Sequence, residues 1–295
     1  MVWDSSPYLA VLTEQDACAS IQRTKETLGV IEQATKDGGV NLVVVRVASG
    51  SGHEFNHRKW MLLKSLAEMK QKRRFTLVVN DDVDLVVKAL SQHIPVDGVH
   101  VKEYKSHLIP SIRNTLKRAA ARTPNGDHRK SHENFIIGTS CHSLQSAQQS
   151  YLLSPLGPDY LFVGTCYPTL SHPEKQSLEQ LEGPAFPGRV RQELRRMYQE
   201  DGGAFANEKK QPQQTSTSSP LPAPQTSVLM QPPVIYAIGG IDERNCQEPV
   251  TRFGAEGVAV IRTVMQAANP RETVRQIKVA MTSQKGDVET TRTLM

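Results

Sequence analysis

The stretch "FTLVVNDDVDLVVKALSQHIPVDGVHV" (75–101) contains the unit from which the fold is built. Residues 75–81 and 97–101 are short β-branched runs without polar–apolar alternation, which is typical of strands buried on both faces. Between them lies a helix-length segment with apolar residues three and four apart, and Asp82 or Asp84 is placed to cap its start. The stretch predicts two parallel strands joined by a helix.

The same alternation continues along the rest of the chain. It predicts further strands at 8–13, 41–47, 134–140, 159–165, 234–240 and 257–262. Eight such units indicate an α/β fold, a single TIM-type (β/α) eight-stranded barrel with its site at the C-terminal strand ends. An open doubly wound sheet is the alternative. That fold expects a Gly-rich turn after the first strand, which "LTEQDACAS" (12–20) does not offer.

One segment interrupts the pattern. Residues 201–233 contain "EKKQPQQTSTSSPLPAPQTS", which is rich in Pro, Ser and Gln and has almost no large apolar residue. Such a segment cannot offset its ordering entropy, so we expect a disordered, low-complexity insertion at about 201–233. Because it falls between the sixth helix and the seventh strand, it interrupts a single barrel domain that spans 1–295.

Composition narrows the class of protein. Hydrophobic residues make up 38% and charged residues 22% of the chain, which is ordinary for a globular protein. No apolar run approaches the roughly 20 residues of a membrane span, and the N-terminus does not resemble a signal peptide. We therefore expect a cytoplasmic protein, with an organellar location left open. Four cysteines without a C-x-x-C pair suit a reducing compartment.

The net charge of the chain indicates which kinds of ligand it binds. The net charge is +5, but aromatic residues are only 5% and the basic clusters are short, which argues against nucleic acid. Small phosphorylated substrates fit this charge, and a membrane partner is not expected. The sequence leaves the oligomeric state open, a homo-oligomer included.

Two patterns suggest metals but have simpler interpretations. "HEFNH" (53–57) matches H-E-x-x-H, yet it stands at the entry to a helix beside the solvated "RKW", and no third zinc ligand follows. We interpret it as an exposed helix start. Cys141, Cys166 and Cys246 each fall near a strand end, where a metal or redox trio is an option. Small apolar packing is the favoured role for isolated cysteines.

Polar residues gather where the predicted strands finish. One of them alone can be a helix cap, but together on one rim they indicate a site. Gly239 and Gly240 follow the seventh strand, where glycine serves either a turn with positive φ or a phosphate held by backbone N–H groups. Arg262, at the matching place after the eighth strand, favours phosphate. The other rim residues are Arg46, Asn80, Asp81, Asp82, His100, Lys102, Ser140 and His142.

Several segments in order resemble the thiamine phosphate synthase/TenI family over roughly residues 8–280, the insertion excepted. They are "VVNDDVD", "DGVHV", "IIGTSCHSLQSA", "DYLFVGTCYPTLSH", "AIGGI" and "GAEGVAVI". The resemblance implies a (β/α) barrel and a transferase of thiamine biosynthesis. Such an enzyme couples hydroxymethylpyrimidine diphosphate to a thiazole phosphate, with Mg²⁺ assisting the release of pyrophosphate.

The resemblance also implies roles for individual residues. Asp81 matches a magnesium ligand, and Ser140 matches a serine near the leaving group. Arg46 and Asn80 match family residues that bind pyrophosphate, and Thr169 and Ser171 match hydroxyls that contact the substrate phosphate. His172 stands in the place of a family lysine, with Lys175 three residues later. The thiazole phosphate site is expected at Gly239, Gly240, the backbone of Val260 and Ile261, and Arg262.

The chain departs from the synthase pattern at several positions. Val44 and Ala48 stand where the family has Gln and Lys, and Lys105 replaces a second magnesium carboxylate. A lysine there repels Mg²⁺, although its ammonium can itself neutralise part of a diphosphate. Glu103 is a nearby candidate to replace the lost carboxylate. These losses affect the coupling reaction more than the binding of thiazole phosphate.

Two alternatives to the synthase remain. One is a TenI-type thiazole tautomerase, an isomerase in which His142 is the base, since imidazole titrates near neutrality. The other is a non-catalytic phosphate-binding relative, in which the insertion binds a partner. The synthase leads because more positions match it. His142 also has a simple structural interpretation, as a residue that packs at or caps the following helix.

Overall fold

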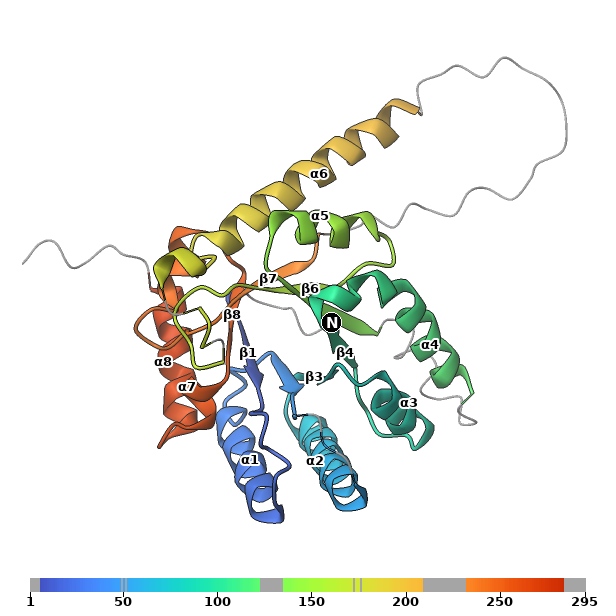
Figure 1. The fold of residues 1–295 in the computed structure, drawn as a ribbon, viewed down its shortest axis with the longest axis vertical. Coiled ribbons are helices and arrows are strands. Elements are labelled where there is room, and N and C mark those ends of the chain that lie inside the picture. The colour runs from blue at the N-terminus through green and yellow to red at the C-terminus, as the bar shows by residue number, and fades with distance from the viewer. Residues whose placement is uncertain are drawn as a thin grey trace, which may run out of the picture.

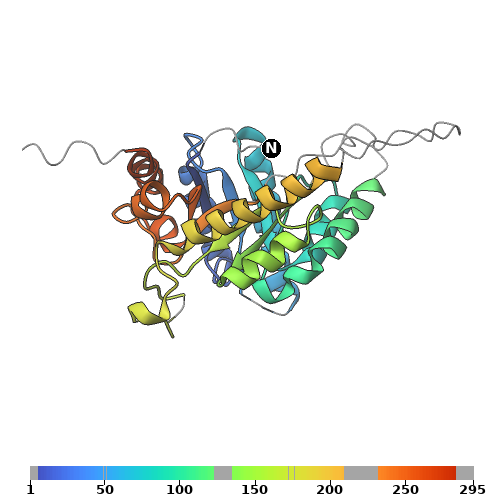
Figure 2. The ribbon, with the colours of Figure 1, turned by 90° about the horizontal axis from the view of Figure 1, so that it is seen from above.

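The computed structural model describes residues 6–48, 50, 52–122, 135–171, 173–175, 177–208 and 232–283. Eight parallel strands close into one barrel in chain order, and the helices surround it (Figures 1 and 2). The predicted TIM-type barrel is confirmed, and each observed strand lies at its predicted place. The strands are β1 Tyr8–Leu12, β2 Leu42–Val45, β3 Thr76–Asn80, β4 Gly98–Val101, β5 Ile136–Cys141, β6 Tyr160–Val163, β7 Val234–Ile238 and β8 Gly257–Val260.

The helices follow the strands as the alternation predicts. The α-helices are α1 Ile21–Ala34, α2 His53–Lys72, α3 Val83–Ser91, α4 Ile109–Ala121, α5 Leu144–Leu152, α6 Phe186–Glu208, α7 Arg262–Met265 and α8 Pro270–Thr282. Shorter turns of other helix types are η1 Glu103–Leu108, η3 Leu178–Gln180 and η4 Glu248–Arg252. Among the described residues, no helix combines the length and apolar character that crossing a membrane requires.

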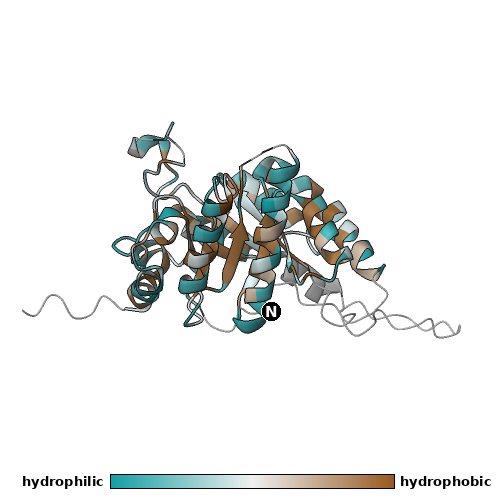
Figure 3. Cartoon of the chain, turned by 90° about the horizontal axis from the view of Figure 1, so that it is seen from below, coloured by the Kyte–Doolittle hydropathy of each residue, from teal (hydrophilic) through white to brown (hydrophobic). Residues whose placement is uncertain are grey.

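The strands are apolar on both faces because both faces are buried. In β1, Ala10 and Leu12 point into the barrel, whereas Leu9 and Val11 pack under the helices. β1 pairs with β8 through Leu9 and Val258, which closes the barrel. The brown strands enclosed by helices with teal outer faces show this layering (Figure 3). Burial of each large aliphatic side chain contributes about 1.5–3 kcal/mol.

Polar side chains fix where the helices begin. Asp82 accepts a hydrogen bond from the amide of Leu85 and caps α3, which confirms one of the two predicted caps. Ser143 and Ser146 form a reciprocal capping box at the start of α5. Asp242 accepts from the amides of Arg244 and Asn245, so it caps a turn after β7.

The predicted insertion needs one correction. Its place between α6 and β7 is confirmed, but residues 201–208 continue α6 as helix, and this helix runs well past α5 in Figure 1. The good helix formers Ala204, Ala206 and Glu208 favour this extension in spite of two glycines. Residues 209–231 lie outside the described residues.

The two metal-like patterns have structural roles. His53 and His57 lie one turn apart on the exposed start of α2, with ring centroids 6.5 Å apart. Among the described residues, no group of three His, Cys, Asp or Glu side chains is placed to hold a metal. All four cysteines are buried free thiols, and burial raises the pKa of Cys166 to about 12. The packing interpretation of the cysteines is confirmed.

Candidate active site

A cavity of about 530 Å³ opens at the C-terminal ends of the strands. Among the predicted site residues, Asp81 and Lys175 do not line it, and His172 lies outside the described residues. The predicted residues that line it are Arg46, Asn80, Ser140, His142, Thr169, Ser171, Gly239, Gly240, Val260, Ile261 and Arg262. Barrel closure therefore brings together most of the residues that the sequence singled out.

One wall of the cavity is an arginine–hydroxyl cluster formed by Arg46, Thr169, Ser171 and Arg262. The Arg262 guanidinium donates to Thr169 Oγ1 over 2.8 Å and to Ser171 Oγ over 3.5 Å. Burial and the nearby charge of Arg262 lower the pKa of Arg46. Within the described residues, neither arginine forms an ion pair with a carboxylate. Two cations without an anionic partner suit a phosphate or diphosphate ligand.

The glycine pair forms a tight turn beside this cluster. Gly239 and Gly240 have φ of 100° and 62°, so both need the left-handed region. A Cβ on Gly240 would lie 2.4 Å from the carbonyl oxygen of Pro168, which shows how closely the loop after β6 approaches. The turn interpretation of these glycines is confirmed. Phosphate binding by their backbone stays a prediction.

A second group of charged residues, the lysine–aspartate cluster, consists of Asp81, Lys102 and Lys105. In it, each carboxylate oxygen of Asp81 faces one lysine ammonium group. Lys105 Nζ lies 2.7 Å from Asp81 Oδ1, and Lys102 Nζ lies 3.5 Å from Oδ2. The hydrogen bond to Asp81 raises the pKa of Lys105, which stays protonated at neutral pH. Asp81 has φ of 54°, a left-handed conformation that Asp and Asn adopt more readily than most residues.

These residues do not fit the Mg²⁺ site that the resemblance implies. Mg²⁺ needs free carboxylate oxygens, but both oxygens of Asp81 face lysine ammonium groups. Glu103 lines the cavity and its Oε1 accepts the backbone N–H of His142, so one carboxylate oxygen is already engaged, and its role as a replacement ligand stays a prediction. A cation approaching Asp81 would meet two positive charges first.

His100 also lines the cavity, and it was identified from the sequence only as a polar strand residue. Its Nε2 lies 3.1 Å from Ser140 Oγ, and its Nδ1 lies 3.1 Å from the hydroxyl of Tyr160. The ring stacks on Phe162 at a centroid distance of 4.6 Å. Burial lowers the pKa of His100 to about 3, so the ring is neutral and positions Ser140 by hydrogen bonding.

A signal for His100 was available in "DGVHV". Val99 and Val101 pack outward under the helices, so strand alternation turns the residue between them into the barrel. A histidine on the inner face of a barrel strand, near its C-terminal end, faces the site.

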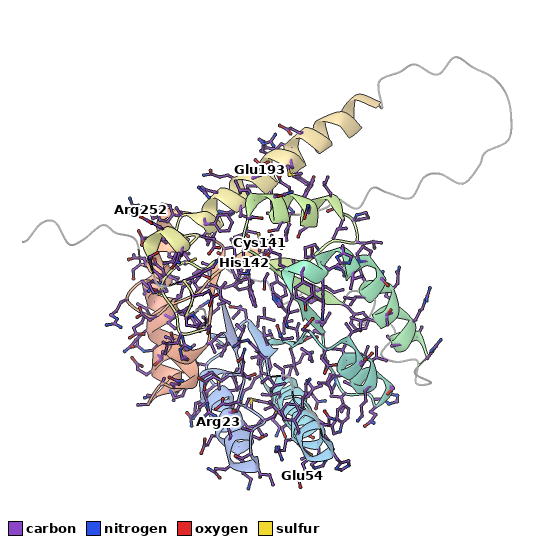
Figure 4. All side chains as sticks on the ribbon, viewed as in Figure 1. Arg23, Glu54, Cys141, His142, Glu193 and Arg252 are labelled. Atoms are coloured by element: carbon purple, nitrogen blue, oxygen red, sulfur yellow. The ribbon has the colours of Figure 1, made fainter. Side chains whose placement is uncertain are left out.

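His142 directly follows β5 and stands beside Cys141 (Figure 4). Its Nδ1 lies 2.5 Å from the carbonyl oxygen of Gly164. A carbonyl only accepts hydrogen bonds, so Nδ1 carries a proton in this contact. The imidazole is therefore held in one orientation at the cavity wall.

Lys175 is engaged elsewhere. Its ammonium lies 2.5 Å from Glu182 Oε1, and the other oxygen of Glu182 accepts the backbone N–H of Thr165. The geometry gives no support to the expectation that Lys175 reaches back to replace the family lysine. It supports the loop after β6 through Glu182 instead.

The chain is similar to known proteins in sequence and in fold. A family model described as thiamine monophosphate synthase matches residues 9–185. The chain is 27% identical over 250 residues to a thiamine-phosphate synthase of Listeria monocytogenes, covering 85% of this chain and 87% of the relative. It is 25% identical over 254 residues to one of Bacillus cereus, covering 86% and 85%. A thiamine phosphate pyrophosphorylase structure from Pyrococcus furiosus has a TM-score of 0.56 at 18% identity, covering 93% and 95%, and supports the fold.

Proposed function

Because the chain belongs to the thiamine monophosphate synthase family, we propose that it joins hydroxymethylpyrimidine diphosphate to a thiazole phosphate. In this reaction the thiazole nitrogen forms a C–N bond to the pyrimidine methylene carbon. The C–O bond to the diphosphate breaks, and pyrophosphate leaves with the electron pair. The product is thiamine phosphate.

The arginine–hydroxyl cluster is the observation that carries this proposal. The reaction needs donors for two phosphorylated groups in one enclosed space, and Arg46 and Arg262 stand in one cavity with no carboxylate partner among the described residues. A cavity of about 530 Å³ has the size of a small-molecule site. Thr169 and Ser171 add hydroxyl donors that Arg262 holds in place.

The chain's own residues have distinct parts in this proposal. Negative charge grows on the pyrophosphate as the C–O bond breaks, so donors placed there act most strongly in the transition state. We assign this part to Arg46, Asn80 and Ser140, with His100 positioning Ser140. Gly239, Gly240 and the backbone of Val260 and Ile261 are assigned to the thiazole phosphate, next to Arg262.

The test is a coupled assay on the purified full chain. Both phosphorylated substrates are supplied with Mg²⁺ and, separately, with EDTA, and thiamine phosphate is quantified by chromatography. We expect product. Absence of product under every metal condition would overturn the synthase proposal, and binding of substrates without turnover would point to a non-catalytic relative.

A second candidate, the thiazole tautomerase, is favoured by the position of His142. The contact from Nδ1 to the Gly164 carbonyl orients the ring, and His142 lines the cavity, where a base would be needed. For this function His142→Asn should abolish proton exchange on a thiazole carboxylate phosphate, whereas exposed His107→Asn should not. Unchanged exchange in His142→Asn would rule this function out. Synthase activity should fall less than about threefold in the same variant, because coupling needs no base at this position.

A further inference from the structure

We propose that Lys102 and Lys105 supply the positive charge at Asp81 that a divalent cation would otherwise provide, so that the diphosphate group binds without Mg²⁺. The inference rests on the proposed function, since it states how that same site holds a diphosphate. Its basis is the lysine–aspartate cluster, in which a carboxylate at a strand end is already covered by cations.

Both carboxylate oxygens of Asp81 face a lysine. Lys105 Nζ and Lys102 Nζ each face a different oxygen of the carboxylate, at 2.7 and 3.5 Å. The Asp81 side chain is 17% exposed, so the pair with Lys105 is partly shielded from solvent. The ammonium of Lys105 therefore occupies the space beside Oδ1 that a bound metal ion would need.

The two lysines supply as much positive charge beside Asp81 as one Mg²⁺ would. One carboxylate with two ammonium groups has the same net charge, +1, as one carboxylate with one Mg²⁺. An ammonium group also has three N–H donors, so the two lysines keep donors beyond those directed at Asp81 and Tyr104. Those donors can bind phosphate oxygens directly, as lysines do in other phosphate sites.

The cluster reaches the cavity through Lys102, since Asp81 and Lys105 are not among the lining residues. Lys102 and Tyr104 line the cavity, and both ammonium groups flank the Tyr104 ring, at 6.0 Å for Lys102 and 5.6 Å for Lys105. Both lysine side chains remain partly exposed, 53% for Lys102 and 34% for Lys105, so they can turn toward a ligand. Asn80, directly before Asp81, lines the same cavity.

The experiment measures binding of inorganic pyrophosphate to the full chain by titration calorimetry, in EDTA and in Mg²⁺. We expect the two affinities to agree within about threefold. In EDTA, Lys105→Gln should weaken binding about tenfold, the effect of one charge-assisted hydrogen bond. Lys117→Gln, an exposed lysine on α4, is the matched control and should bind as the wild type does.

Lys105→Asp is the complementary variant, because it restores a second carboxylate beside Asp81. We expect its pyrophosphate binding to become at least tenfold stronger in Mg²⁺ than in EDTA. Circular dichroism of each variant checks folding. Wild-type binding that collapses in EDTA would overturn the inference, as would a Lys105→Gln variant that matches Lys117→Gln.

Failure of this inference can be distinguished from failure of the proposed function. Metal-independent pyrophosphate binding without thiamine phosphate formation would sustain this inference and count against the synthase. Thiamine phosphate formation together with pyrophosphate binding that requires Mg²⁺ would do the reverse.

Discussion

The two ends of the barrel use the same charged residue types in opposite ways. At the N-terminal end, Asp97, Asp159 and Glu256 each accept the amide of a neighbouring strand and each pair with a lysine or arginine. At the C-terminal end, Arg46 and Arg262 face a cavity without a carboxylate partner among the described residues. Charges at the first end form ion pairs and hydrogen bonds within the fold, and we propose that those at the second bind a ligand.

The lysine–aspartate cluster lies between these two cases. It stands at the C-terminal end, yet its carboxylate is paired as at the N-terminal end. A ligand at the arginine–hydroxyl cluster meets cations held by neutral hydroxyls, whereas a ligand near Asp81 competes with a carboxylate for the lysines. The difference predicts tighter anion contacts on the arginine side.

The largest expected effect is on stability, at the N-terminal end. Arg113 donates to the carbonyls of Phe135 and Gly157 and to Asp159, so Arg113→Ala removes three hydrogen bonds and the ion pair of Asp159. We expect the free energy of unfolding to fall by about 3 kcal/mol in urea titrations. The kcat/KM of the folded enzyme should change less than threefold, by about 0.6 kcal/mol at most. Exposed Arg118→Ala is the control, and an equal loss in both would contradict the comparison.

Arg262→Ala tests the C-terminal end. It removes a cation from the cavity and the hydrogen bond to Thr169, so kcat/KM for thiamine phosphate formation should fall on the order of 100-fold. The melting temperature should stay within a few degrees of wild type, because no carboxylate is left unpaired. Arg275→Ala, which removes an exposed side chain that pairs with Glu272 on α8, should keep full activity. Severe unfolding of Arg262→Ala would place this residue with the structural charges instead.

His100 gives a pH-dependent test. Its pKa is about 3 in the folded protein and 6.5 as the ordinary value, so below pH 6.5 the unfolded chain binds a proton that the native ring does not. Stability from this group is therefore complete above pH 6.5 and is lost as the pH falls toward 3. Between pH 7 and 5 the wild type should lose about 2 kcal/mol more than His100→Gln does.

The same substitution reports on Ser140. We propose that His100 positions Ser140 and does not itself donate a hydrogen bond to the substrate. His100→Gln should therefore lower kcat several-fold and leave KM near wild type. Acid sensitivity equal to wild type in His100→Gln would show that another group titrates. His107→Asn, an exposed histidine, should retain the wild-type pH dependence.

Asp81→Asn has the smallest expected effect and a sign that distinguishes two roles. Asn tolerates the φ of 54°, so the fold is kept, while both lysines lose their anionic competitor. Pyrophosphate affinity in EDTA should rise about threefold, or 0.6 kcal/mol. If Asp81 were a metal ligand, affinity in Mg²⁺ would fall instead, and calorimetry separates these outcomes.

Most of the fold was predictable because its signals are local. The β-branched runs without alternation, such as 75–81, and the apolar spacing of the intervening helices depend on neighbours within a few residues. The error at 201–208 has the same origin, since composition suggested disorder where the end of a helix extends a few turns farther. The list of rim residues followed from strand ends alone.

The sequence by itself determined a closed eight-stranded barrel and the side chains that converge on its C-terminal rim, because strand polarity and alternation are written in short-range patterns. The tertiary structure decided which of those side chains meet. Arg262 contacts Thr169 from 93 residues away, and Lys105 covers Asp81 from 24 residues away. Lys175 turns to Glu182 instead of the cavity. These partners depend on barrel closure and on side-chain geometry across separate loops, which residue order does not encode locally.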